Sequence, residues 1–225
     1  MMYRETPFYR ALVGGDYPVI VSLARHDLDL ARAALDAGAT AIKTHLNAYH
    51  RATGTTFGSF STERPFFEAL AKLGCPLLVM AGQETVPSAE EMAALAALGF
   101  EGFNVYVDHM QPHLLQSSLR PMPALSATST PEDVTRIAAM PGCIIEASIM
   151  PFERYRTAMT DTDLERYAAV VRSVDVPVIV PSQLALTPQD AKRLREAGIA
   201  APLLGAIVTG ETPKSMQAAV SAFAL

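Results

Sequence analysis

The chain has 225 residues, 50% hydrophobic and 18% charged, so it can bury a large core and is not expected to be disordered. Its 18 Lys and Arg against 23 Asp and Glu give a formal charge of −5, with no polybasic run, which argues against nucleic acid and acidic membrane surfaces as partners. Cys75 and Cys143 are the only cysteines, which excludes a disulfide framework or cysteine zinc site and fits a reducing cytoplasm.

The first residues lack the apolar core and cleavage site of a signal peptide, so export is not expected. Apolar runs such as LLVMAG stop well short of the roughly 18 residues that a membrane-spanning helix needs.

Short aliphatic runs alternate with amphipathic segments along the chain, and this alternation predicts eight strand-helix units. The expected strands, in chain order, are Pro18–Ala24, Ala41–Leu46, Pro76–Ala81, Phe103–Val107, Pro123–Ala127, Cys143–Ile149, Pro177–Val180 and Pro202–Val208. Two prolines precede the core of the fifth, which makes it the weakest strand signal.

Helix signals follow these runs. Asp27 opens the first helix and Gly38 closes it, while Ser88 and Glu91 form a capping box that opens the third. Three later helices share one device, a cap threonine followed by proline: Thr130-Pro131, Thr187-Pro188 and Thr212-Pro213.

Eight such units without a composition break predict an α/β fold, a single-domain (β/α)8 barrel over residues 1–225, with residues 1–17 as an N-terminal cap. An open doubly wound sheet is the alternative. It should carry a glycine-rich turn after the first strand, where this chain reads SLARHD.

Strand parity selects the candidate site residues, because barrel enzymes place their chemistry at the C-terminal ends of the strands. In the second strand Lys43, His45 and Asn47 share one face. The residues expected to line a substrate-binding mouth are Ser22, Asn47, Asn104, Tyr106, Asp108, Ser126 and Gln183.

The second and sixth strands lie across the ring, so Lys43 and Glu146 are expected to face each other. Two opposite charges inside a barrel either pair or shift their pKa values. The functional interpretation is a proton-transfer pair, assisted by His45; the alternatives are a structural ion pair, or a Schiff-base lysine at position 43.

All five histidines lie at or just beyond proposed strand ends, and with Asp108, Glu84 and Glu146 they could hold a divalent metal, although no HxH or HExxH motif occurs. The long connection 47–60 reads as a lid, a binding loop or a plain surface excursion, and Arg51 on it could reach an anionic substrate.

The last third of the chain, with Pro177-Val178-Ile179, Thr187-Pro188-Gln189 and Gly205-Ala206-Ile207, resembles the N-acetylmannosamine-6-phosphate 2-epimerases of the ribulose-phosphate-binding barrel superfamily. The early segment ALDAGATAIKT is also similar, with Lys43 where that family tends to carry arginine. The family's glutamate would fall on residues 181–183, which read PSQ and contain no acid. Its lysine would fall within LLVMAGQE, which contains no lysine, so the epimerase chemistry is not carried over.

The resemblance implies a phosphate site in the turn after the last strand, and free amides at a helix start attract anions independently of it. The candidates are Ser182, Gly205, Ala206, Thr209 and Gly210; alternatively, the two glycines merely allow a tight turn.

These observations lead to one hypothesis: a cytoplasmic isomerase, epimerase or aldolase that acts on a phosphorylated sugar or similar small anion, without an organic cofactor and as a homo-oligomer. A non-catalytic small-molecule-binding barrel is the second hypothesis. A metal-dependent hydrolase using His45, Asp108 and Glu146 is the third.

Overall fold

Eight parallel strands close into a barrel in the computed structural model, which describes residue 3 and residues 5–224. The strands are β1 (Ile20–Ser22), β2 (Ala41–His45), β5 (Leu77–Met80), β6 (Phe100–Tyr106), β7 (Arg120–Leu125), β8 (Ile145–Ala147), β9 (Val178–Pro181) and β10 (Ala201–Leu204). Strand β1 pairs with both β2 and β10, which closes the ring. The predicted single-domain (β/α)8 barrel is therefore confirmed.

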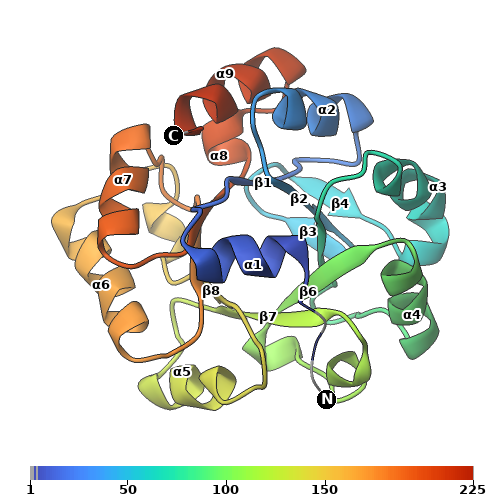
Figure 1. Cartoon of the computed structure of the whole chain (residues 1–225), viewed down its shortest axis with the longest axis horizontal. Coiled ribbons are helices and arrows are strands. Elements are labelled where there is room, and N and C mark those ends of the chain that lie inside the picture. Colours follow the sequence, from blue (N-terminus) through green and yellow to red (C-terminus); the bar gives the residue numbers. More distant parts are fainter. Residues whose placement is uncertain (1–2, 4, 225) are drawn as a thin grey trace.

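Helices surround the ring, as Figure 1 shows from one end of the barrel. They are α2 (Leu28–Asp36), α3 (Phe60–Ala71), α4 (Ala89–Ala97), α5 (Pro131–Ala138), α6 (Asp161–Arg172), α7 (Pro188–Glu196), the four-residue α8 (Ala206–Thr209) and α9 (Pro213–Phe223). Between β6 and β7 the chain makes only two 3-10 turns, η1 (Val107–His109) and η2 (Leu114–Gln116). A third, η3 (Phe152–Arg154), follows β8.

The predicted helix caps are present. The side chains of Thr130, Thr187 and Thr212 each accept a hydrogen bond from the backbone amide three residues later, and proline occupies the first helical position. This arrangement satisfies an amide that the helix itself leaves unpaired. Ser88 and Glu91 form the expected capping box at the start of α4.

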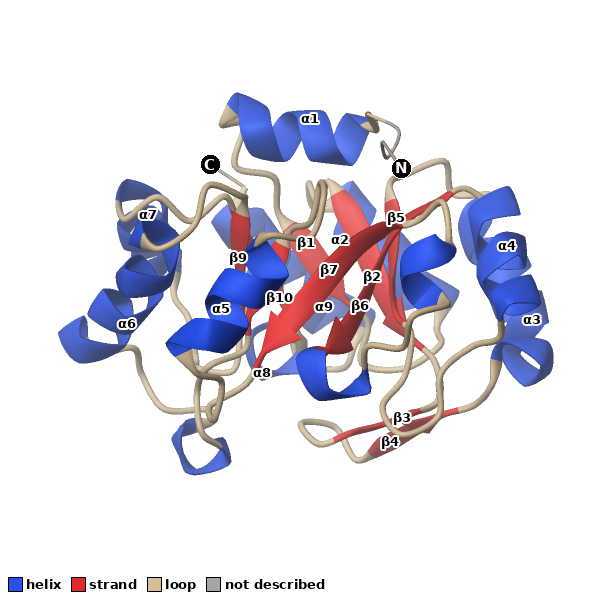
Figure 2. Ribbon diagram, turned by 90° about the horizontal axis from the view of Figure 1, so that it is seen from below, coloured by secondary structure: helices blue, strands red, loops and turns tan. Residues whose placement is uncertain are grey.

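Helix α1 (Pro7–Gly14) lies across the N-terminal end of the barrel (Figure 2). Its Phe8 and Leu12 pack into an apolar cluster inside the ring, formed by Ile20, Ala41, Leu78, Met122, Ile144, Ile179, Ala201 and Leu203. That cluster fills the N-terminal half of the barrel interior with apolar side chains. Residues 1, 2 and 4 of the expected cap lie outside the described residues.

The predicted bounds of the strands differ from the observed ones, and for two strands the difference has a clear physical reason. Strand β7 begins at Arg120 and contains both Pro121 and Pro123, because a proline lacks only its N–H and its carbonyl can still accept; Pro121 accepts from the Ile144 amide at 3.1 Å. The run Pro202–Val208 was expected to be one strand, but it ends as a strand at Leu204 and continues as α8. Gly205 separates the two, and a short apolar run shows no period that could distinguish strand from helix.

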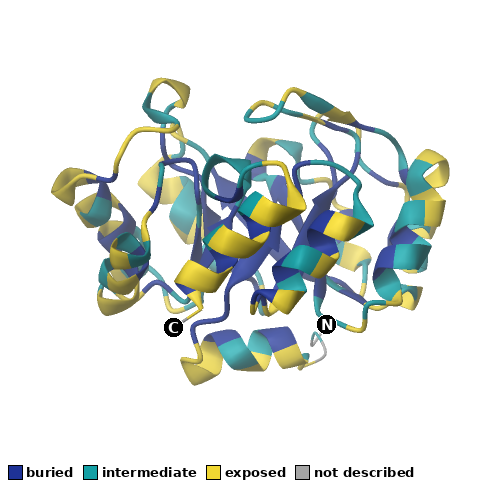
Figure 3. Ribbon diagram, turned by 90° about the horizontal axis from the view of Figure 1, so that it is seen from above, coloured by how far each residue is buried: buried dark blue, intermediate teal, exposed yellow. Residues whose placement is uncertain are grey.

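The connection 47–60 contains an unpredicted antiparallel hairpin, β3 (Ala48–His50) with β4 (Thr55–Phe57). It lies at the end of the barrel opposite α1 (Figures 2 and 3), where the strands have their carboxyl ends. The buried residues in Figure 3 run through the strands and the inward faces of the helices. Within the described part of the chain, no helix has the length and apolar character to cross a bilayer.

Candidate functional site

A buried ion pair occupies the barrel interior above the apolar cluster. Lys43 on β2 places its Nζ 2.5 Å from Glu146 Oε2 on β8, and the two side chains are only 4% and 7% exposed. Lys43 Nζ also donates to Asn104 Oδ1 on β6 at 3.1 Å. The structure therefore brings together the two charges that strand parity predicted to face each other.

Further hydrogen bonds hold this pair in place. Asn104 donates through Nδ2 to the Met122 carbonyl at 2.6 Å, which directs its oxygen toward Lys43. Ser148 Oγ donates to Glu146 Oε1 at 3.1 Å, so each carboxylate oxygen has a partner. Buried charges are tolerated only when they are paired and hydrogen-bonded in this way.

Lys43 and Glu146 line a cavity of about 430 Å³ at the carboxyl ends of the strands. This is the end of a (β/α)8 barrel at which active sites occur. Among the residues that sequence analysis selected, its walls contain Lys43, His45, Glu146, Ser22, Asn104, Tyr106, Asp108, Ser126, Ser182, Gln183, Gly205 and Ala206.

Three selected residues do not line this cavity: Asn47, Thr209 and Gly210. Asn47 lies two residues beyond the end of β2 and has a φ of +46°, so the strand alternation that placed it beside Lys43 has already ended. Thr209 and Gly210 lie at the far end of α8, where the Thr209 hydroxyl donates to the Gly205 carbonyl at 3.2 Å. The structure therefore does not place these three residues in the wall of the cavity.

Gln183 lines the cavity, but the protein already uses its amide. Its Oε1 accepts from the Met150 amide at 3.0 Å, and its Nε2 donates to the Ser148 carbonyl at 3.1 Å and to Tyr155 Oη at 2.7 Å. The residue expected to bind substrate thus connects the loops that follow β8 and β9. Ser182 behaves similarly, because its Oγ accepts from the Gly205 amide at 2.7 Å.

His45 is buried in the cavity wall between aromatic rings. Its ring lies 4.8 Å from that of Phe57 and 4.9 Å from that of His50, measured between centroids. Burial, followed by the charges of His50, Lys43 and His26, lowers the pKa of His45 well below its usual range. The imidazole is therefore neutral at pH 7, and its Nδ1 has no hydrogen-bond partner among the described residues.

The other histidines do not gather into a ligand set. His26 stacks on Phe66 with its Nδ1 3.1 Å from Glu63 Oε2, outside the cavity, and His113 contacts the Pro87 carbonyl at 2.8 Å. Among the described residues, no group of three or more His, Cys, Asp or Glu side chains has an arrangement that could hold a metal ion. The set of His45, Asp108 and Glu146, considered for a hydrolase, is thus not assembled as a metal site.

His50 gives a testable pH dependence. Burial, with the charge of Lys43, lowers the pKa of His50 from 6.5 to about 4, and its Nδ1 lies 2.8 Å from Thr53 Oγ1. Between these two pH values the unfolded chain binds a proton here that the folded protein does not, so stability falls as the pH falls. We expect His50→Asn to reduce this slope in urea unfolding at pH 7 and 5; an identical slope in the variant would contradict the assignment.

The loop after β8 contributes to the site, although none of its residues was predicted to do so. Met150, Pro151, Phe152 and Tyr155 all line the cavity from this loop. Phe152 and Tyr49 of the hairpin are 53% and 54% exposed, and both belong to the cavity wall. A loop has no period from which its inward residues can be read, and the only signal was a cluster of aromatic residues shortly after a strand with a glutamate.

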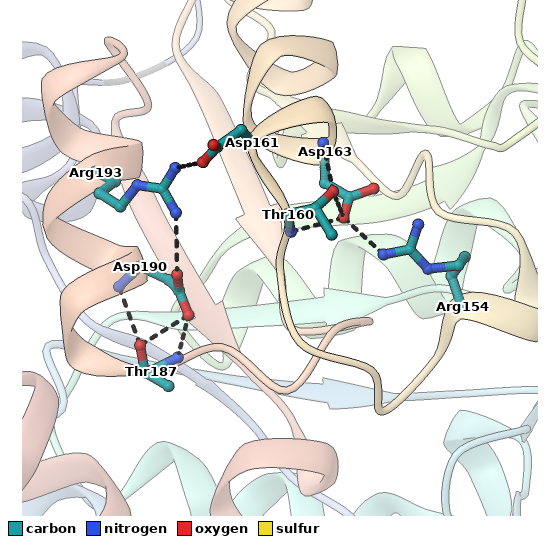
Figure 4. Close-up of polar contacts among 7 residues, drawn as sticks. All are labelled: Arg154, Thr160, Asp161, Asp163, Thr187, Asp190 and Arg193. Atoms are coloured by element: carbon teal, nitrogen blue, oxygen red, sulfur yellow. Dashed lines mark hydrogen bonds and ion pairs between the residues drawn. The ribbon is translucent and has the colours of Figure 1, made fainter.

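Side-chain bonds from α6 fix this loop (Figure 4). Arg154 donates to Asp163 at 2.7 Å, and Asp163 also accepts from the amide and hydroxyl of Thr160, the cap of α6. Burial opposes ionisation of Asp163, but these hydrogen bonds outweigh it and lower its pKa. Helix α7 begins with an equivalent cap, in which Thr187 donates to Asp190. Arg193 of α7 forms ion pairs with Asp190 and with Asp161 of α6, and so joins the two helices.

No protein-family model matches this sequence, and neither does any curated protein. Tryptophan synthase from M. tuberculosis is similar in structure, with a TM-score of 0.71 and 16% identity over 100% of this chain and 98% of that one. The tryptophan synthase A-subunit of Pyrococcus furiosus gives 0.67 at 12% identity, covering 93% of this chain and 97% of that one. Thiamine phosphate pyrophosphorylase from the same organism gives 0.64 at 12%, covering 96% and 95%. At these identities the likeness shows the barrel fold.

Proposed function

We propose that this protein is an enzyme that moves a proton at a carbon atom next to a carbonyl group, in a small anionic metabolite. The observation that carries the proposal is the Lys43–Glu146 contact of 2.5 Å, buried at the floor of a cavity at the catalytic end of the barrel. An enzyme is further supported by the structural neighbours, whose names are those of a synthase and a pyrophosphorylase.

The step divides between the two side chains. Glu146 accepts the proton as the C–H bond breaks, and the electron pair of that bond moves onto the carbonyl oxygen. The Lys43 ammonium group stabilises the negative oxygen, and return of the proton completes an isomerisation or epimerisation. Both charges are held in position before the substrate arrives, by Asn104 and Ser148, so little reorganisation is needed.

A Schiff-base mechanism at Lys43 is disfavoured by this contact. The amine would have to leave Glu146, and the carboxylate would remain buried without its cation. Covalent trapping with borohydride tests this alternative directly, because reduction of an iminium leaves the substrate joined to Lys43 by a stable C–N bond.

For the anionic group of the substrate we propose the turn at the start of α8, in line with the resemblance to the ribulose-phosphate-binding superfamily. The amides of Ala206 and Ile207 belong to the first helical turn and have no helical acceptor, and both residues line the cavity. Ser182 uses the Gly205 amide, which leaves these two amides for a phosphate oxygen.

The test is solvent exchange in D2O. Phosphorylated aldoses and ketoses are incubated with the protein, and proton NMR follows the C–H signals next to the carbonyl. We expect loss of one such signal as deuterium enters. Thermal stabilisation by a sugar phosphate without exchange in any compound would instead indicate a binding barrel without catalysis.

A further inference from the structure

Tyr155 lines the cavity and is hydrogen-bonded to the side-chain amide of Gln183, whose orientation is set by neighbouring backbone groups. Gln183 Oε1 lies 3.0 Å from the Met150 amide, which can only donate, so this end of the side chain is the oxygen. Gln183 Nε2 lies 3.1 Å from the Ser148 carbonyl, which can only accept, so the other end is the nitrogen. The amide of Gln183 therefore has one possible orientation.

This orientation fixes the role of the Tyr155 oxygen. Gln183 Nε2 can only donate hydrogen bonds, and it lies 2.7 Å from Tyr155 Oη. The phenol oxygen therefore accepts this bond. The hydroxyl hydrogen of Tyr155 is then free for a different acceptor. No described residue accepts it, and the phenol is half-buried in the cavity wall.

The same hydrogen bonds connect Tyr155 with the ion pair. Ser148 accepts from Gln183 through its carbonyl and donates through its hydroxyl to Glu146 Oε1 at 3.1 Å. Three hydrogen bonds hold the loop that carries Tyr155. The Gln183 side chain donates to Tyr155, Arg154 donates to Asp163 (Figure 4), and the Arg156 amide donates to the Gln183 carbonyl at 3.0 Å. A donor on such a loop keeps its direction without a ligand present.

We propose, on the premise of the proton-transfer function above, that Tyr155 donates a hydrogen bond to the substrate oxygen that becomes negative, and that Gln183 is the positioning residue that sets this direction. No proton leaves Tyr155 in the step. The C–H proton goes to Glu146, its electron pair goes to the carbonyl oxygen, and that oxygen meets two fixed donors, the Tyr155 hydroxyl and the Lys43 ammonium group.

The test uses 2-phosphoglycolate, whose carboxylate mimics an enediolate next to a phosphate, and inorganic phosphate as the second probe. We expect Tyr155→Phe to raise the dissociation constant for 2-phosphoglycolate about ten- to a hundredfold, as for loss of a hydrogen bond to a charged group, and to leave phosphate binding unchanged. Titration calorimetry measures both.

Gln183→Glu tests the direction itself. A carboxylate can only accept, so in this variant the Tyr155 hydroxyl donates to the new carboxylate. The phenol stays in place, but it no longer offers a hydrogen bond to a ligand in the cavity. We expect the same weakening as in Tyr155→Phe. Should this variant fail to fold because the carboxylate faces two carbonyls, Tyr155→Phe decides alone.

Tyr17→Phe is the matched control, since it removes a 2.6 Å bond to the Ala191 carbonyl outside the cavity and should leave binding unchanged. Wild-type affinity in Tyr155→Phe, or an equal loss for inorganic phosphate, overturns the proposal for Tyr155 alone. Failure of the wild-type protein to bind 2-phosphoglycolate overturns the proposed function and this proposal with it.

Discussion

Replacing Glu146 by glutamine should lower the rate of solvent-deuterium exchange into the substrate about 10²- to 10⁴-fold, the contribution typical of a positioned general base. The amide fills the same volume and can still accept from Ser148, which now donates to Glu146 Oε1 at 3.1 Å. It cannot take a proton from carbon. Exchange is followed by proton NMR on whichever sugar phosphate the D2O screen identifies.

Glu101→Gln is the control for this variant. Glu101 lies at the other end of the barrel, where its carboxylate accepts from the Phe8 amide at 3.3 Å, so the same chemical change should leave exchange at the wild-type rate. If Glu146→Gln folds and also exchanges at that rate, Glu146 is not the base and the buried pair is structural.

The fold could be predicted because each of its signals is local and repeated. A cap threonine followed by proline marks α5, α7 and α9, and every one of these caps forms in the structure. In a closed parallel ring each strand has one face toward the interior and one toward the helices. The two-residue alternation of side chains was therefore enough to predict that Lys43 and Glu146 face each other, and they are in contact in the structure.

The same rule failed for Asn47, where the backbone leaves the extended conformation. Asn47 has the parity of Lys43, but it lies beyond the last residue of β2 and has a positive φ. Thr209 was assigned from the resemblance to a phosphate-binding turn, whereas the chain is helical from Ala206 to Thr209 and places this residue at the far end of α8. Tyr155 lies in a loop, and only the tertiary contacts of Gln183 place it in the cavity wall.

Lys43→Met should lower the free energy of unfolding by about 3–5 kcal/mol, because it leaves Glu146 as an uncompensated charge in the barrel interior. Methionine fills similar space, so lost charge rather than a cavity dominates the loss. Urea unfolding at pH 7 measures it. Arg64→Met removes an exposed ion pair with Glu68 as the control, and should cost less than about 1 kcal/mol.

The double variant Lys43→Met/Glu146→Leu separates the cost of one unpaired charge from the worth of the pair. With both charges removed, nothing charged remains to be solvated inside the ring, so we expect the double variant to be more stable than Lys43→Met. A double variant no more stable than the single one would contradict this account. A double variant that also matches or exceeds the stability of the wild-type protein would show that stability does not require the pair, which is the result expected if the pair serves the proposed proton transfer.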